Sequence, residues 1–239
     1  MERTMFVFRI AKGRDGGLFS GECPIDFKTK FESTILNDLH KINVGQIPYE
    51  TNNYIDYLHR ELWQCGKLRQ GWGIEGLNLL DVLDNENAKS EWIKHYIIGL
   101  KKCWSTDPLD PTAGYSENYL PCHEASGRMT MLAQVMLRAK PHDIIFIPKH
   151  SFQNQHDENF FTVCEVIGKY YFDLNPLYQD FGHVLSVRNL KTYPYDNEIR
   201  GIDFGGFYQR AVSTIEAHHQ VYEKLLQFIK NRYLPIISK

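Results

Sequence analysis

"FFTVCEVIGKYYFDL", residues 160–174, is the stretch that decides the fold class. Apolar side chains occupy both alternating sets of positions from Phe160 to Ile167, which predicts a strand partly covered on both of its faces. Gly168 follows as a turn, so residues 169–174 are expected to return as the hairpin partner of this strand. "DIIFIPK" (143–149) predicts a strand before it, and "GHVLSVRNLKTY" (182–193) predicts one or two more strands after it.

Helices are expected on both sides of this β block. Hydrophobic residues recur every three or four positions over 27–42, 87–104 and 124–140, which is the spacing of an amphipathic helix. A first strand is predicted at residues 4–11 and a long terminal helix at residues 207–233. The fold class is therefore α+β, with a small curved mixed sheet or pseudo-barrel, surrounding helices and a long C-terminal helix.

Composition narrows the class of protein. The chain has 239 residues and a formal net charge of −2, so any attraction to nucleic acid has to come from a local basic face. No apolar run approaches the roughly 18 residues of a membrane span, and no signal peptide is recognisable. The five cysteines form no CxxC pair and are expected to be reduced thiols in a cytoplasmic protein. We expect no membrane contact.

The usual sequence motifs of hydrolases, P-loop proteins and zinc proteases are missing. The sequence contains no GxSxG, P-loop or HExxH pattern, and no spacing typical of a metal site. One enzymatic alternative is a metal-dependent nuclease built on Glu165 and Lys169, with Asp173 or Asp180. Glu165 and Lys169 are four residues apart and flank Gly168, whereas such a site needs them two apart on one strand face. We expect no catalytic residues, no cofactor and no metal.

Binding chemistry is concentrated in "WQCGKLRQGWG", residues 63–73. Flat aromatic faces stack on a nucleobase, amides and backbone groups read its edge, and cations contact phosphates. The predicted base pocket consists of Trp63, Gln70, Gly71, Trp72 and Gly73, with Tyr170 and Phe172 from the segment after Gly168. The predicted phosphate contacts are Lys67, Arg69, Lys149, Arg188 and Lys191. The structural alternative is that Trp72 closes the core from a hairpin turn and that Tyr170 and Phe172 are core residues.

Three stretches resemble the PUA-like superfamily, which includes the EVE, YTH and ASCH domains. They are "GKLRQGWG" (66–73), "LRAKPHDIIFIPK" (137–149) and "FFTVCEVIGKYYFD" (160–173), and the resemblance covers about residues 60–195. His142 stands where the family usually has glycine, so the geometry of that turn is an open point. The resemblance implies a pseudo-barrel with a pocket for a flipped or modified base, used in restriction, defence or RNA processing.

The first hypothesis is therefore a non-catalytic module that binds DNA or RNA through a modified or flipped base. We expect one domain over residues 1–203, and a C-terminal helix over 204–239 that docks on or links to an effector protein. The alternatives are the nuclease described above and a protein-interaction module whose aromatic pocket binds a peptide.

Overall fold

The computed structural model describes residues 3–10, 53–83, 86–99, 121–154, 157–174, 181–196, 199 and 211–234. The helix predicted over 27–42 and the proposed domain boundary between residues 203 and 204 lie outside these ranges. Within them no helix is long and apolar enough to cross a membrane.

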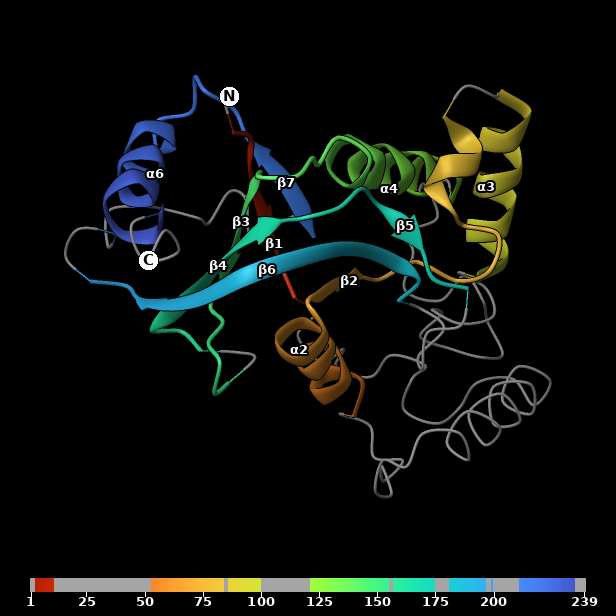
Figure 1. The fold of residues 1–239 in the computed structure, drawn as a ribbon. Helices are drawn as coiled ribbons and strands as arrows, with labels where there is room; N and C mark the ends of the chain where they lie inside the picture. The colour runs from red at the N-terminus through yellow and green to blue at the C-terminus, as the bar shows by residue number, and fades with distance from the viewer. Residues whose placement is uncertain are drawn as a thin grey trace.

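Seven strands form one mixed sheet in the described part of the chain. It is curved into a half-barrel (Figure 1), with the order β2-β6-β4-β3-β1-β7 and with β5 also paired to β6. β1 runs parallel to β3, whereas the other pairs are antiparallel. The strands are β1 (Met5–Phe8), β2 (Lys67–Gln70), β3 (Ile144–Pro148), β4 (Phe160–Val166), β5 (Tyr171–Phe172), β6 (His183–Pro194) and β7 (Val212–Ile215). The α+β prediction is confirmed at this level.

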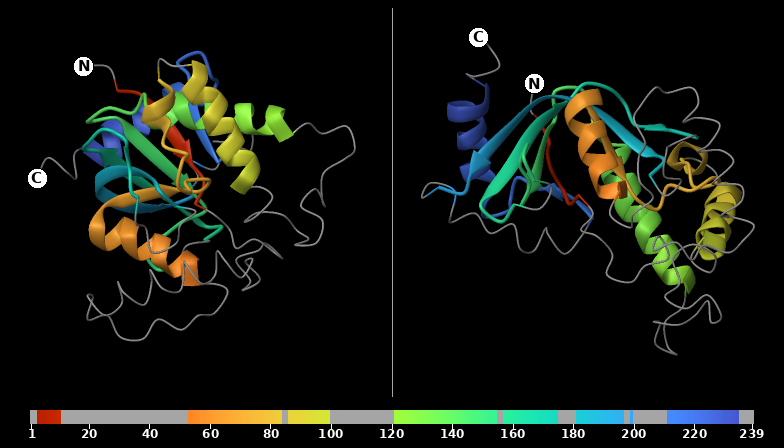
Figure 2. Two further views of the ribbon diagram at one scale, coloured as in Figure 1. Left: turned by 90° about the vertical axis from the view of Figure 1, so that its right-hand side faces the viewer. Right: turned by 90° about the horizontal axis from the view of Figure 1, so that it is seen from below.

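Helices cover both faces of the sheet. Figures 1 and 2 show α6 beside β3 and β4, whereas α4 and α3 lie toward the other end of the molecule. The helical elements are α2 (Asn53–Cys65), the 3-10 turn η2 (Leu79–Val82), α3 (Glu86–Gly99), α4 (Pro121–Met136), α6 (Tyr222–Phe228) and the π-helical turn η4 (Ile229–Tyr233).

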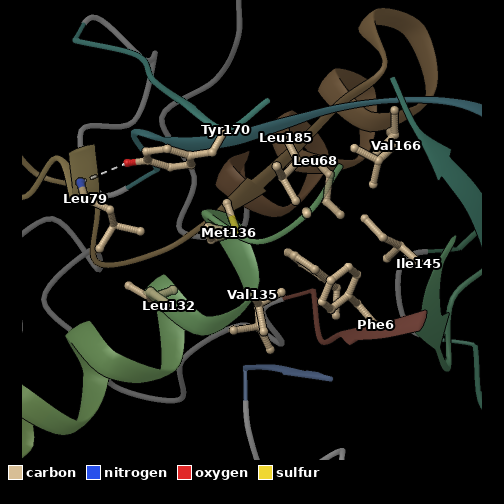
Figure 3. Packing of buried hydrophobic residues seen from close by; sticks show 14 of the residues in the cluster. Phe6, Leu68, Leu79, Leu132, Val135, Met136, Ile145, Val166, Tyr170 and Leu185 are labelled. Atoms are coloured by element: carbon tan, nitrogen blue, oxygen red, sulfur yellow. Dashed lines mark hydrogen bonds between the residues drawn. The ribbon is translucent and has the colours of Figure 1, made fainter. Parts of the chain in front are cut away.

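Side chains that alternate along β1 and β3 build one core on each face of the sheet. Phe6 and Ile145 belong to the larger core, which also includes residues of α2, α3 and α4. Figure 3 shows part of it, with Val135 and Met136 of α4 turned toward Phe6 and Leu68. The smaller core, on the other face, includes Met5, Val7, Ile144, Phe146, Leu225 and Phe228. The two faces therefore present different surfaces, and a residue's position in the alternation decides which one it joins.

The strand predicted at 169–174 pairs differently from expectation. Tyr171 and Phe172 pair with Val184 and His183 of β6, so the predicted hairpin with β4 is wrong. Both edges of β4 are already occupied by β3 and β6. After β4 the chain continues along β6, where the Ile167 amide donates to the Ser186 carbonyl at 2.9 Å.

The prediction of a long C-terminal helix over residues 207–233 is also wrong. Val212–Ile215 form β7, antiparallel to β1, and the helix begins at Tyr222 and continues through η4 only to Tyr233. Val212 and Ile215 are three residues apart, which suits a helical face, but β-branched residues also favour a strand when an open edge such as that of β1 is available.

Candidate functional site

Trp72 is held between glycines because two backbone segments cross there. A Cβ on Gly73 would lie 2.5 Å from the amide nitrogen of Gly182, and a Cβ on Gly182 would meet the carbonyl oxygen of Gly73. The Gly182 amide donates to that carbonyl at 3.1 Å. The absence of a side chain at Gly73 therefore permits two backbone segments of the chain to pack closely.

A buried hydrogen-bonded chain holds the backbone at Trp72. His183 is fully buried, and its desolvation lowers its pKa to about 3, so the imidazole is neutral. Its Nε2 lies 3.2 Å from the Trp72 carbonyl oxygen, which can only accept, so Nε2 carries the proton. Nδ1 then accepts from the Tyr170 hydroxyl at 2.9 Å, and that hydroxyl accepts from the Leu79 amide at 3.2 Å. Every group in this chain has a partner (Figure 3 shows the Tyr170–Leu79 bond).

Four predicted pocket residues thus meet around His183. Trp72 has the positive backbone angle φ 62° and is half-buried, with the Arg128 guanidinium of α4 4.5 Å from the centre of its ring. The Phe172 ring lies edge-on to His183, with a centroid distance of 5.3 Å. Gln70 is buried at the end of β2, and Gly71 is buried beside it. We call Trp72, Gly73, Tyr170, Phe172 and His183 the Trp72 group.

Lys67 and Arg69 are two residues apart on β2, so both side chains lie on the same face of the strand, where both contact Glu61 of α2. Arg69 is buried, and its guanidinium donates to Glu61 at 2.7 and 3.0 Å, to Asp173 at 2.7 Å and to the Phe181 carbonyl at 3.0 Å. Lys67 forms an ion pair with Glu61 at 3.4 Å. Arg69 therefore ties α2, β2 and the chain before β6 together, while its proposed contact with phosphate stays a prediction.

A second aromatic group surrounds Trp63 on α2. The His150 ring lies nearly parallel to the indole of Trp63, at an angle of 7° and a centroid distance of 6.0 Å. Phe152 is edge-on to Trp63 at 5.0 Å and is 63% exposed. His59, one turn before Trp63, lies 5.4 Å from the His150 ring and 2.9 Å, through Nε2, from the Phe152 carbonyl oxygen. We call Trp63, His59, His150 and Phe152 the Trp63 group.

His150 is fixed as a hydrogen-bond acceptor. The Thr162 hydroxyl donates its one proton to the His150 carbonyl oxygen at 3.1 Å, so it accepts from the Nδ1–H of His150 at 2.9 Å. Burial lowers the pKa of His150 to about 3, which leaves Nε2 as an unprotonated nitrogen with a lone pair. That nitrogen is buried and has no hydrogen-bond partner among the residues that the structure describes.

The indole N–H of Trp63 is likewise buried, with no hydrogen-bond partner in the described part of the chain. A buried polar group without a hydrogen bond costs about 1–3 kcal/mol, and most buried tryptophan N–H groups find a partner. The Trp63 group therefore holds a donor and an acceptor that no described residue satisfies. This is the chemical difference from the Trp72 group.

The remaining predicted cations are spread over both faces of the sheet. Lys149, next to His150, forms an ion pair with Glu158. Thr162 and Thr192 are paired across β4 and β6 with their hydroxyls 3.4 Å apart, on the His150 side. Lys191 is the neighbour of Thr192 and so projects from the opposite face, as Arg188 also does beside Glu165.

Both carboxylates of the nuclease alternative that the structure describes, Glu165 and Asp173, are bonded to neighbouring side chains. Glu165 is buried and accepts from His142 at 2.6 Å, from Asn189 at 3.0 Å and from Arg188 at 3.2 Å, and these bonds hold its pKa below the usual value against the opposing effect of burial. Asp173 is paired with Arg69, and Asp180 lies outside the described residues. Among the described residues no three His, Cys, Asp or Glu side chains are grouped to hold a metal ion.

α2 was not predicted from the sequence, and the position of His59 beside Trp63 was therefore not predicted either. The signal was present: Leu58 and Leu62 are four residues apart and both buried, and Gly66 ends the helix with φ 63°. Recognition of that helix would have placed His59 and Trp63 on one face of it, one turn apart.

Comparison with known proteins assigns the chain to no family. No family model matches it, and no curated protein and no solved structure shows significant similarity to it.

Proposed function

We propose that this protein is a non-catalytic nucleic-acid-binding module that takes an unpaired or flipped base at the Trp63 group. The observation that carries the proposal is the pair of unsatisfied nitrogens, one a donor on Trp63 and the other an acceptor on His150, beside the exposed ring of Phe152. Nucleobases present donors and acceptors along their edges and flat faces for stacking, which complements both features of the site.

The location of the group supports the same conclusion. β1 and β3 are parallel, so their carboxyl ends lie at one edge of the sheet, and His150 follows β3 directly. Exposed Phe152 lies over Trp63 at that edge. We expect a base to approach the buried nitrogens from this edge, by stacking on Phe152 or by replacing it on Trp63. The resemblance to PUA-like modules for modified bases adds to this proposal.

The test is a titration of intrinsic tryptophan fluorescence with short DNA and RNA strands at low and moderate salt. The strands are unmodified or carry 5-methylcytosine, 5-hydroxymethylcytosine or N6-methyladenine. Stacking on an aromatic side chain contributes about 1–3 kcal/mol per base, so Phe152→Ala is expected to weaken binding about 5- to 150-fold. Trp63→Phe, which removes the indole N–H, is expected to weaken it as well.

Trp72→Phe is the matched control, because it changes a tryptophan while leaving the backbone carbonyl that His183 holds. It is expected to retain the affinity of the unmodified protein. If no strand binds, the proposal is wrong. If binding is lost in Trp72→Phe and retained in Trp63→Phe and Phe152→Ala, the base lies at the Trp72 group instead.

A further inference from the structure

A second surface, at the opposite end of β4, carries an excess of positive charge. It consists of Arg3 before β1, Lys140 and His142 before β3, Lys169 after β4 and Arg188 on β6, and we call it the basic rim. Lys140, His142, Lys169 and Arg188 are exposed, and Arg3 is partly exposed. Of these residues only Arg188 belonged to the predicted phosphate contacts.

Backbone pairing brings these residues together from distant parts of the chain. The His142 amide donates to the Val166 carbonyl at 2.8 Å, three residues before Lys169. Glu165 is paired with Arg188 across β4 and β6. The Thr4 amide, next to Arg3, donates to the Asp143 carboxylate at 2.9 Å. The rim is thus the edge of the sheet at which β1 and β3 begin.

The acidic residues of this edge point inward and are already bonded. Asp143 is buried, and its carboxylate accepts from the backbone amides of Thr4 and Lys140, both at 2.9 Å. Glu165 is buried and accepts from His142, Arg188 and Asn189. The carboxylates therefore organise the rim from beneath, and the charges that it presents to solvent are positive.

Two features indicate that the rim has unused capacity for an anion. The Nη1 of Arg3 is buried without a hydrogen-bond partner in the described ranges, and its ion pair with Glu165 is long, at 3.9 Å. Lys140 and Lys169 form no ion pair with any described residue. In addition, His142 keeps the left-handed turn (φ 78°) at a position where glycine is more easily accommodated, and its ring is anchored on Glu165.

We propose that the basic rim binds the phosphodiester backbone of a nucleic acid, independently of base identity. The chain carries a formal net charge of −2, so this local charge, and not the global one, attracts a polyanion. Combined with base binding, this inference rests on the proposed function: the strand that places a base at the Trp63 group continues along the molecule to the rim.

The separation of the two surfaces sets a minimum length for such a strand. The His150 amide bonds to the carbonyl of Phe160, at the start of β4, and the rim lies at Glu165, near its end. Five residues of a strand span about 17 Å, and stacked nucleotides rise about 3.4 Å each, so the strand has to extend about five nucleotides beyond the bound base.

The experiment uses an abasic phosphodiester strand of twelve units, labelled for fluorescence anisotropy, with the full chain at 50 to 200 mM salt. The variant Lys140→Gln/Lys169→Gln removes two exposed charges of the rim. Each lost phosphate contact is expected to reduce the slope of log K against log salt by about 0.7, or about 1.4 for the pair. The matched control is Lys224→Gln/Lys230→Gln, which removes the same charge from exposed positions of α6 and η4.

The inference is overturned if the abasic strand does not bind, or if the control variant changes the slope as much as the rim variant does. Its failure is distinguishable from failure of the proposed function. Binding of base-containing strands that depends on Trp63, without binding of the abasic strand, leaves the base site and removes the rim. Equal binding of both kinds of strand, unaffected by Trp63→Phe, leaves the rim and removes the base site.

Discussion

The Trp72 group and the Trp63 group have similar composition and opposite hydrogen-bonding states. Each contains a tryptophan, a buried neutral histidine and a phenylalanine, and each packs against the larger core. Around Trp72 every nitrogen of His183 is bonded. Around Trp63 the indole N–H and the His150 Nε2 have no partner among the described residues. The two groups therefore have the same aromatic content, and they differ in the pairing of their polar atoms.

Among the substitutions around the Trp72 group, we expect the largest loss of stability at Arg69, because its guanidinium is a buried charge with two carboxylate partners. Arg69→Met leaves Glu61 and Asp173 without their main cation, and we expect a loss of about 4 kcal/mol in the free energy of unfolding. Lys67→Met, at the half-exposed pair with Glu61, is expected to cost less than about 1 kcal/mol. Urea denaturation measures both, and equal losses would contradict the structural role of Arg69.

Gly73→Ala tests the close contact between the backbone at Gly73 and the backbone at Gly182. The added methyl group would lie 2.5 Å from backbone that is itself hydrogen-bonded, so we expect a loss of about 3 kcal/mol in unfolding free energy. Gly127→Ala on α4 is the matched control, because its Cβ would meet nothing within 4 Å. That change is expected to stabilise the protein by about 0.5–1 kcal/mol, since glycine is unfavourable inside a helix. Chemical denaturation of the two variants should therefore give opposite signs.

The hydrogen-bonded chain below Trp72 is tested by Tyr170→Phe. Loss of the hydroxyl leaves the buried Leu79 amide and His183 Nδ1 without partners, and we expect a loss of about 2 kcal/mol. Tyr193→Phe removes a hydroxyl whose one hydrogen bond, to the Arg232 carbonyl, is 3.4 Å long, and should cost less. A smaller effect at Tyr170 than at Tyr193 would mean that the Trp72 group is not closed by these bonds.

The pH dependence of stability tests whether His150 of the Trp63 group is held in its neutral form. Burial lowers its pKa to about 3, below the value of about 6.5 expected in the unfolded chain. The unfolded chain therefore binds a proton that the folded chain does not, and stability falls as the pH decreases from about 6.5 toward 3. Between pH 7 and pH 5 this effect of one histidine is about 2 kcal/mol.

His150→Phe is accordingly expected to lose about 2 kcal/mol less than the unmodified protein between those two pH values. Denaturation curves at pH 7 and pH 5 give the difference directly. An unchanged pH dependence in His150→Phe would show that His150 is not held in its neutral form.

The sequence predicted correctly those elements whose hydrophobic pattern fits only a helix or only a strand. β1, β3, β4 and α4 lie within the predicted ranges or within a few residues of them, because their apolar patterns are long or continuous. Val212 and Ile215 fit both a helix and a strand, and the free edge of β1 decided between them. Tyr171 and Phe172 formed a strand as expected, but their partner depended on which edges the rest of the sheet left open.

Prediction of the candidate site was weaker for a related reason. Residue type made Trp63 and Trp72 equally good candidates for a base pocket, since both are tryptophans near glycines and cations. Whether a polar atom is bonded depends on residues more than eighty positions away, His150 for one group and His183 for the other. Local sequence carries no signal for such a contact.

β1 has a consequence for the order in which the protein assembles during synthesis. Met5 pairs with Ile144 on one side and with Ile215 on the other, so β1 is completed by two strands that are synthesised much later than β1 itself. At about 5–20 residues per second, its apolar residues wait on the order of ten seconds or more for both partners. In a nascent chain the apolar residues of β1 therefore stay without their final strand partners until β7 has been made.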